Sequence, residues 1–273
     1  VLAGGRILEE QYWNGGSPTS TQDIASCQKS IVSTLIGCAV DRQLLSIDDP
    51  ASKYLPPGWT NATPEEEAAI TIRQLLSMTS GLDQQTLKLV APPGTKWQYN
   101  TTAYQKLRTV IEKAASGEIQ PITREWLFDP IGVSDLSAWL PREGNGPFAL
   151  DATGARLWAL AMTARDMARV GLLVQRKGRW GDRVVVPETW FAQALVPSQK
   201  MNNHYGFLWW LVNDQPPIPS DTVAALGALD QKIYVCPSLD AVVTRQGAAA
   251  GQATEAGSGF DLEVLSRLVA ARR

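Results

Sequence analysis

The sequence is poor in the residues that usually build metal sites and disulfide frameworks. It has one histidine, His204, and three cysteines, Cys27, Cys38 and Cys236, which lie far apart. An odd, scattered set of cysteines predicts neither a disulfide framework nor a CxxC metal motif, so no metal site is expected and the redox compartment stays open. No cofactor is implied either.

Long apolar runs and blocks of positive charge are also missing. The longest apolar-rich run, residues 31–40, is about half of the roughly 20 residues that a membrane-spanning helix needs, so we expect no membrane span. The formal net charge is −2 and no basic cluster occurs, which argues against nucleic acid or an acidic membrane as a partner. Small-molecule chemistry is therefore favoured.

The length and composition are those of a globular protein. With 273 residues, 44% of them hydrophobic, the chain can form one large core or two closely packed lobes. Because the sequence begins at Val1 rather than at a methionine, any signal peptide or leading helix would lie outside it. Bacterial periplasm and cytoplasm both remain open as compartments.

The order of sequence patterns predicts an α+β fold. Residues 1–13 are typical of a short strand pair turning at Gly4-Gly5, and helical spacing dominates from 21 to about 154. Thr163 is placed to start a helix ending at Gly178. Three strands and a last helix follow at 205–213, 232–237, 240–247 and 260–271. We expect an antiparallel-sheet lobe (1–22 and 155–273), an inserted all-helical lobe (23–154) and a ligand cleft between them.

The stretch "IASCQKSIVSTLIGCAV", residues 24–40, carries the first candidate chemistry. Ser26 and Lys29 are three positions apart, so on a helix they share a face and the amine can take the hydroxyl proton. The backbone N–H of Ser26 at the helix start is a candidate oxyanion donor. Cys27 points about 100° away and is expected in the core. The alternative is a serine cap beside a solvated lysine, because an isolated SxxK occurs by chance.

The surrounding sequence resembles a known family. The segment "ASCQKSIVSTLIGCAVDRQLLSIDDPASKYLPPGW" is similar to the nucleophile segment of the class C β-lactamase-like serine hydrolases, which include DD-peptidases, esterases and nylon-oligomer hydrolases. The segments "ITIRQLLSMTSGL", "PPGTKWQYNTTAY", "TARDMARVGLLV", "YGFLWWL" and "IYVCPSLDAVVTRQG" resemble later parts of that family in the same order. The resemblance covers nearly the whole chain and implies a β-lactamase/transpeptidase-like fold with Ser26 as nucleophile.

The same resemblance assigns a role to Tyr99. Its hydroxyl should face Ser26, and a nearby Lys29 ammonium would favour the phenolate, so that the three groups share protons. The alternative is a tyrosine at a lobe surface. Thr101 stands where the family has asparagine, and it offers one hydroxyl in place of an amide.

The third family motif aligns with Ala225-Leu226-Gly227 and lacks the usual cation. Loss of a charge-assisted hydrogen bond removes about 1.5–3 kcal/mol, or roughly tenfold to a hundredfold in affinity for a carboxylate. An efficient β-lactamase is disfavoured, whereas an enzyme for uncharged acyl groups is not. Gly227 would let the backbone approach the substrate, and the N–H of Ala228 would complete the oxyanion hole. Gln231 is a further candidate at this edge; the alternative is a simple buried turn.

Aromatic residues next to the lone histidine are candidates for an acyl pocket. In a strand over 205–213, Tyr205 and Trp209 would share one face and Trp210 would take the other, so Tyr205 and Trp209 are predicted to bind substrate. A triad through His204 is disfavoured because no serine lies in a GxSxG sequence.

Together these features predict a serine hydrolase. It would cleave a small ester, an amide or a β-lactam through an acyl-enzyme on Ser26. The alternative is a penicillin-recognising or catalytically impaired binding protein of the same fold. A sheet face left open by a missing N-terminal helix also allows an oligomer.

Overall fold

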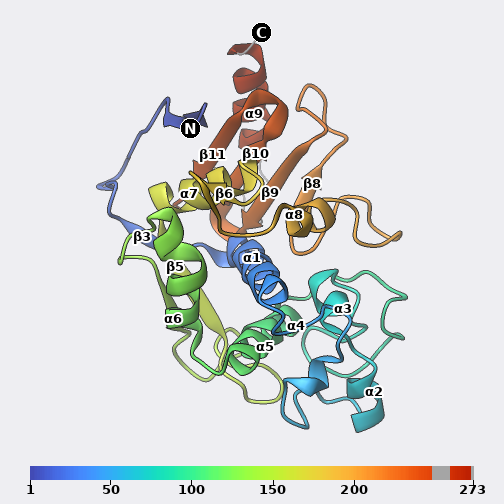
Figure 1. Cartoon of the computed structure of the whole chain (residues 1–273). Coiled ribbons are helices and arrows are strands. Elements are labelled where there is room, and N and C mark those ends of the chain that lie inside the picture. The colour runs from blue at the N-terminus through green and yellow to red at the C-terminus, as the bar shows by residue number, and fades with distance from the viewer. Residues whose placement is uncertain (248–258, 272–273) are drawn as a thin grey trace.

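The computed structural model describes residues 1–247 and 259–271, with side chains in the last segment from Glu263 onward. Figure 1 shows a sheet-containing part beside α9 and a part made mostly of helices, with α1 between them. The predicted α+β class is confirmed. The first residues of the chain and α9 (Gly259–Ala271) both lie in the sheet-containing part.

A six-stranded antiparallel sheet joins the two ends of the chain. Its strand order is β2-β1-β11-β10-β9-β8. The strands are β1 (Leu2–Ala3), β2 (Arg6–Ile7), β8 (Trp210–Val212), β9 (Thr222–Gly227), β10 (Gln231–Cys236) and β11 (Ala241–Arg245). The predicted turn at Gly4-Gly5 is confirmed, since Leu2 pairs with Ile7 on one side and with Val242 of β11 on the other.

The two faces of this sheet pack against different helices, as the alternation of side chains along a strand requires. Ile233 and Val235 of β10 face the main core, which includes side chains of α7 (Ala164–Gln175). Tyr234 and Cys236 face a smaller cluster that includes Leu265 of α9 (Gly259–Ala271). The helix predicted after Thr163 is confirmed, because the Thr163 side chain caps α7 by accepting a hydrogen bond from the Asp166 N–H.

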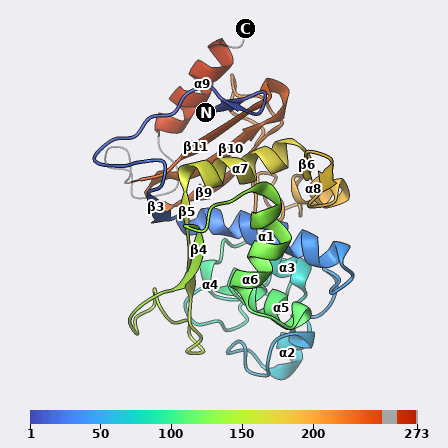
Figure 2. The same cartoon turned by 60° about the vertical axis from the view of Figure 1, so that its left-hand side comes forward.

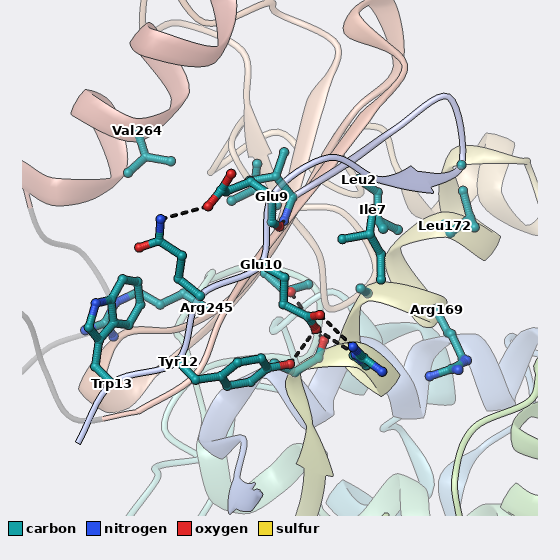
Figure 3. A pocket seen from close by; sticks show the side chains of 18 of the residues that line it. Leu2, Ile7, Glu9, Glu10, Tyr12, Trp13, Arg169, Leu172, Arg245 and Val264 are labelled. Atoms are coloured by element: carbon teal, nitrogen blue, oxygen red, sulfur yellow. Dashed lines mark hydrogen bonds and ion pairs between the residues drawn. The ribbon is translucent and has the colours of Figure 1, made fainter. Parts of the chain in front are cut away.

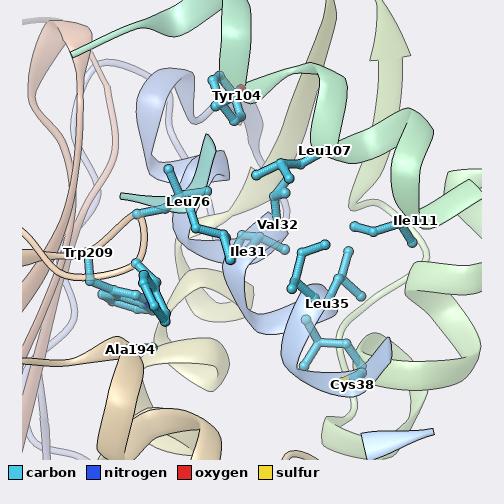
Figure 4. Packing of buried hydrophobic residues seen from close by; sticks show 14 of the residues in the cluster. Ile31, Val32, Leu35, Cys38, Leu76, Tyr104, Leu107, Ile111, Ala194 and Trp209 are labelled. Atoms are coloured by element: carbon cyan, nitrogen blue, oxygen red, sulfur yellow. The ribbon is translucent and has the colours of Figure 1, made fainter. Parts of the chain in front are cut away.

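Helix α1 (Gln28–Asp41) runs through the middle of the molecule. Residues 28–39 are all buried, and these include the polar side chains of the first two turns. Figure 4 shows Ile31, Val32 and Leu35 of α1 packed among side chains of the helical part. In Figures 1 and 2, α1 lies between the sheet and the helical part, so the start of α1 is fixed by both.

The remaining helices follow α1 along the chain. They are α2 (Pro64–Ala68), α3 (Ile72–Leu76), α4 (Thr101–Tyr104), α5 (Lys106–Ala115), α6 (Ile119–Thr123) and, later, α8 (Glu188–Ala194). Short helical turns occupy Ala25–Cys27, Ala51–Lys53, Arg124–Phe128, Asp129–Ile131, Ala228–Asp230 and Pro237–Leu239. Capping boxes at Thr63 and Thr71 begin α2 and α3.

Two features differ from the sequence prediction. The range 23–154 is not purely helical, because β4 (Ala138–Pro141) lies in it and pairs with β5 (Trp158–Thr163) in a small sheet of order β3-β5-β4 that includes β3 (Thr21–Asp23). Strand β5 reads "WALAMT", and a short apolar run without alternation does not distinguish strand from helix. A two-stranded hairpin, β6 (Arg179–Trp180) and β7 (Arg183–Val184), follows α7.

The predicted strand over 205–213 is the second difference. Only Trp210–Val212 form β8, while Tyr205 meets Trp210 across a tight turn. Leu208 has a φ of 60°, a conformation incompatible with a continuous strand. The expected alternation of Tyr205, Trp209 and Trp210 is therefore wrong.

Candidate active site

Ser26 lies in a strained turn between β3 and α1. Ala25, just before it, has a φ of 47°, which is rare for a residue with a side chain. The turn is held because the Ala25 N–H donates to the Asp23 carboxylate at 2.8 Å and the Ile24 N–H donates to the Leu160 carbonyl at 3.0 Å. Backbone strain of this kind persists only where the surroundings enforce it, and it is common at functional sites.

Lys29 contacts Ser26 directly. Its Nζ lies 2.9 Å from Ser26 Oγ and 3.3 Å from the hydroxyl oxygen of Thr101. The side chain is 2% exposed, and burial lowers the pKa of Lys29 to about 7. A large fraction of this amine is thus neutral near pH 7, as a proton acceptor must be. The structure brings Ser26 and Lys29 together, as their spacing predicted, and it places Thr101, which the sequence suggested as a substrate contact, against Lys29.

Tyr99 completes this group from the helical part of the molecule. Lys29 Nζ is 4.8 Å from the centroid of its ring. Burial raises the pKa of Tyr99 to about 12, while a hydrogen bond with Ser26 acts in the opposite direction. The prediction that Tyr99 is a phenolate is therefore wrong near neutral pH. Its supposed partner, the Lys29 ammonium, is itself destabilised by burial.

The two residues after Tyr99 have different roles: Asn100 caps a helix, and Thr101 contacts Lys29. The Asn100 side chain caps α4 by accepting hydrogen bonds from the N–H groups of Thr102 and Ala103, and it donates to the Leu82 carbonyl. Thr101, one residue on, presents its hydroxyl to Lys29. The asparagine in this segment is thus a helix cap.

The end of β9 lies against the Ser26 turn. A Cβ on Gly227 would come within 2.4 Å of the Ile24 carbonyl oxygen and 3.2 Å of the Cys27 nitrogen. The close approach that requires glycine is therefore to the turn carrying Ser26. Ala225 and Leu226 provide no cation at this edge, and Ala228 follows Gly227 directly.

Gln231 and Cys27 serve this junction structurally. The Gln231 amide donates to the carbonyls of Leu229 and Gly247 and accepts from the Gly247 N–H, so the structure does not present it to a ligand as the sequence suggested. A buried amide is held by such backbone partners. The Cys27 thiol donates to the carbonyls of Ala225 and Gln231, and burial raises its pKa. The prediction that Cys27 is a core residue is confirmed.

Aromatic rings surround Tyr99 on its other side. The Trp210 ring stacks on Tyr99 with centroids 5.8 Å apart, and Tyr205 meets Tyr99 edge-on at 6.1 Å. The Trp97 ring meets Tyr205 with centroids 5.6 Å apart. The sequence analysis did not predict Trp97 in this group, although residues two apart, such as Trp97 and Tyr99, lie on the same side of an extended chain. Trp209 is fully buried near Ala194 and Leu76 (Figure 4), and Tyr205 is 1% exposed, so the structure presents neither ring to a ligand as the sequence suggested. Trp210 is only partly buried.

His204 lies outside this group. Its Nδ1 is 2.9 Å from the Asn213 side-chain oxygen, and its Nε2 is 3.6 Å from the Asp214 carboxylate. These contacts agree with the prediction that it belongs to no Ser-His-Asp triad.

A cavity of about 980 Å³ opens elsewhere, between the N-terminal segment, α7, β11 and α9. Figure 3 shows Leu2, Ile7 and Leu172 along it. Glu10 forms a two-pronged ion pair with Arg165 at 2.6–2.7 Å at one end. None of the residues grouped around Ser26 lines this cavity.

Comparison with known proteins identifies the family. The profile of the family described as Beta-lactamase matches residues 1–246. The chain belongs to the β-lactamase family. It is 22% identical over 295 residues to the 6-aminohexanoate-dimer hydrolase of Paenarthrobacter ureafaciens, covering 90% of this chain and 70% of that protein.

Solved structures share the fold of this chain. A protein from Bacteroides dorei DSM 17855 superposes with a TM-score of 0.79 at 22% identity, covering 99% of this chain and 91% of that chain. EstCE1, described as a hydrolase with promiscuous acyltransferase activity, superposes with a TM-score of 0.72 at 19% identity, covering 92% and 85%. The predicted β-lactamase/transpeptidase-like fold is confirmed.

The described part of this β-lactamase-family chain lacks both metal-ligating clusters and membrane-spanning helices. Residues 1–247 and 259–271 contain no cluster of three or more metal-ligating side chains. Within the same ranges, no helix has the length and hydropathy of a membrane span.

Proposed function

We propose that this protein is a serine esterase or amidase that forms an acyl-enzyme on Ser26. The observation that carries the proposal is the 2.9 Å contact between Ser26 Oγ and a buried Lys29 whose pKa is lowered to about 7. A serine hydroxyl needs an adjacent base to become a nucleophile, and an amine with a pKa near the working pH is well suited to that task.

The proposed reaction has two steps. Ser26 Oγ bonds to the carbonyl carbon of the substrate while Lys29 takes its proton, and the oxyanion is held by the N–H groups of Ser26 and Ala228. Tyr99, protonated at neutral pH, relays a proton from Lys29 to the leaving alcohol or amine as the ester or amide bond breaks. Water then attacks the acyl-enzyme by the same route and releases the acid.

The proposed substrate carries an uncharged acyl group. No cation stands at Ala225-Leu226-Gly227 to hold a carboxylate, and the partly buried ring of Trp210 stacks on Tyr99 and contacts the partly buried ring of Trp97. Aromatic faces contact apolar groups well and leave a carboxylate without a donor. We therefore favour esters and short amides over β-lactams, in line with the hydrolase names of two relatives.

Burst kinetics with a p-nitrophenyl ester test the nucleophile. Wild type should release about one equivalent of nitrophenol rapidly if deacylation is slower, and Ser26→Ala should release none. Ser33→Ala is the matched control, because Ser33 Oγ lies buried in α1 without a hydrogen-bond partner. A burst retained in Ser26→Ala would refute the proposal.

The missing cation also fits a penicillin-recognising protein that has lost turnover. Mass spectrometry after incubation with an ester, a fluorophosphonate and penicillin separates the two functions. Turnover of the ester with adduct on Ser26 supports the hydrolase. A stable adduct without turnover supports the binding protein instead.

A further inference from the structure

Lys29 has aromatic rings where a buried lysine commonly has a carboxylate. Its Nζ is 4.2 Å from the ring centroid of Tyr104 and 4.8 Å from that of Tyr99. Among the described residues, no acidic side chain forms an ion pair with Lys29. The ammonium form therefore depends on two hydroxyl contacts and two ring faces, of which the Tyr104 face is the nearer.

Tyr104 is held rigidly in this position. It is 1% exposed, and its hydroxyl accepts a hydrogen bond from Gln105 Nε2 at 3.1 Å and another from Gln28 Nε2. Both amides also donate to the carbonyl of Trp158 in β5. This connects α1, α4 and β5 around one phenol, although the reaction proposed above gives its hydroxyl no proton to transfer.

We propose that Tyr104 is a positioning residue whose ring stabilises the Lys29 ammonium formed when Ser26 loses its proton. The proposal rests on the acyl-transfer function proposed above. When Ser26 Oγ bonds to the carbonyl carbon, its proton passes to Lys29 Nζ and a positive charge appears 4.2 Å from the ring centroid. The negative face of the ring attracts that charge strongly because water is excluded.

The charged and titratable groups around Lys29 leave this role to the ring. Burial favours the neutral amine, and Arg142 acts in the same direction through its positive charge. Arg142 is itself paired with Asp23 at 2.7 Å. Cys27 acts in the opposite direction, but burial raises the pKa of its thiol, so it is uncharged at neutral pH. Tyr99 is likewise protonated there, since burial raises its pKa to about 12.

Loss of the negative ring face should lower the pKa of Lys29. A desolvated cation–π contact corresponds to about one pKa unit or somewhat more. The acid limb of kcat/KM would then move down by about one pH unit. The plateau rate would fall by up to about tenfold, because the charge that forms on Lys29 is less stabilised.

The test compares two variants of the same shape. Tyr104→Phe keeps the negative ring face, whereas pentafluorophenylalanine at position 104, introduced by nonsense suppression, reverses the polarity of that face. Both lack the hydroxyl, so the loss of its contacts with Gln28 and Gln105 is common to them. The readouts are the pH profile of p-nitrophenyl ester hydrolysis and the direct titration of Lys29 by NMR with 13Cε-labelled lysine.

We expect the acid limb of kcat/KM for Tyr104→Phe to lie within about 0.3 pH unit of wild type. The acid limb of the pentafluorophenylalanine variant should lie about one pH unit lower. Equal limbs and equal Lys29 titrations in the two variants would overturn the proposal, even if both lose activity. Should Tyr104→Phe not fold, 3,5-difluorotyrosine at position 104 keeps the hydroxyl and is compared with wild type in the same way. Fluorophosphonate labelling of wild type separates the two proposals: labelled Ser26 with equal limbs refutes only the role of Tyr104, and unlabelled Ser26 refutes both.

Discussion

At the scale of single residues, the site depends on a lysine that is easily deprotonated. Lys29 is buried, and its Nζ donates hydrogen bonds to two hydroxyl groups, those of Ser26 and Thr101. A hydroxyl stabilises an ammonium less than a carboxylate does. Desolvation therefore dominates and lowers its pKa to about 7. The amine and Ser26 form a base–nucleophile pair without a histidine.

The pH dependence of activity follows from this. Because the base must be neutral, kcat/KM should fall about tenfold per pH unit as pH drops below about 7, where Lys29 becomes protonated. Lys29→Arg, permanently charged, should lose about 10²–10⁴-fold on the plateau above pH 7 and should lack the acid limb. Steady-state rates between pH 5 and 9 measure both effects. Activity that rises on acidification would assign the base elsewhere.

Residue identity was more predictable than residue orientation. The spacing of Ser26 and Lys29 placed them correctly, because helical geometry fixes positions three apart. Gln231 and Trp209 were predicted to face a ligand, but the first is held by backbone groups and the second is buried. Their orientation follows from the turn after Leu208 and from the bend at Leu229, both with a φ of 60°, which one sequence does not reveal.

At the scale of elements, close approaches of α1 fix the position of the site. The chain brings α1 against α8 at Gly37, just as it brings β9 against the Ser26 turn at Gly227.

Thr163 and the strands at 231–236 and 241–245 could be predicted, because caps and β-branched runs are local signals. Strands β4 and β5 could not, since their pairing joins segments that carry no alternation.

Gly37→Ala tests this packing. A Cβ at position 37 would lie 2.4 Å from Cγ of Trp190, so the ring or the helix must shift. Overpacking destabilises by about 1–3 kcal/mol, which exceeds the roughly 1 kcal/mol that alanine gains over glycine in a helix. Urea denaturation measures the difference. Gly146→Ala, where the Cβ meets nothing within 4 Å, is the control, and equal stability of the two variants would contradict the packing argument.

At the scale of the whole molecule, the active site opposes folding. Sheet and helices enclose Lys29 almost completely, so the fold disfavours its charged form while the unfolded chain does not. At pH values below about 7 the full penalty applies, and above the ordinary lysine pKa of about 10.4 it disappears. Stability contributed by this residue therefore rises with pH between these limits, because the unfolded state binds more protons.

Lys29→Met should remove that penalty. The variant should be more stable than wild type by several kcal/mol at pH 6–7, and its advantage should shrink by about 1.4 kcal/mol per pH unit between pH 7 and 9. The buried cysteines and tyrosines have raised pKa values and lower stability at high pH, but they are common to both proteins and cancel in the difference. Urea midpoints at each pH measure it, with Lys88→Met, at an exposed lysine, as the control for the lost charge. A pH-independent difference would show that the folded protein holds Lys29 in its charged form throughout this range, and so that Lys29 is not the neutral base that the proposed reaction requires.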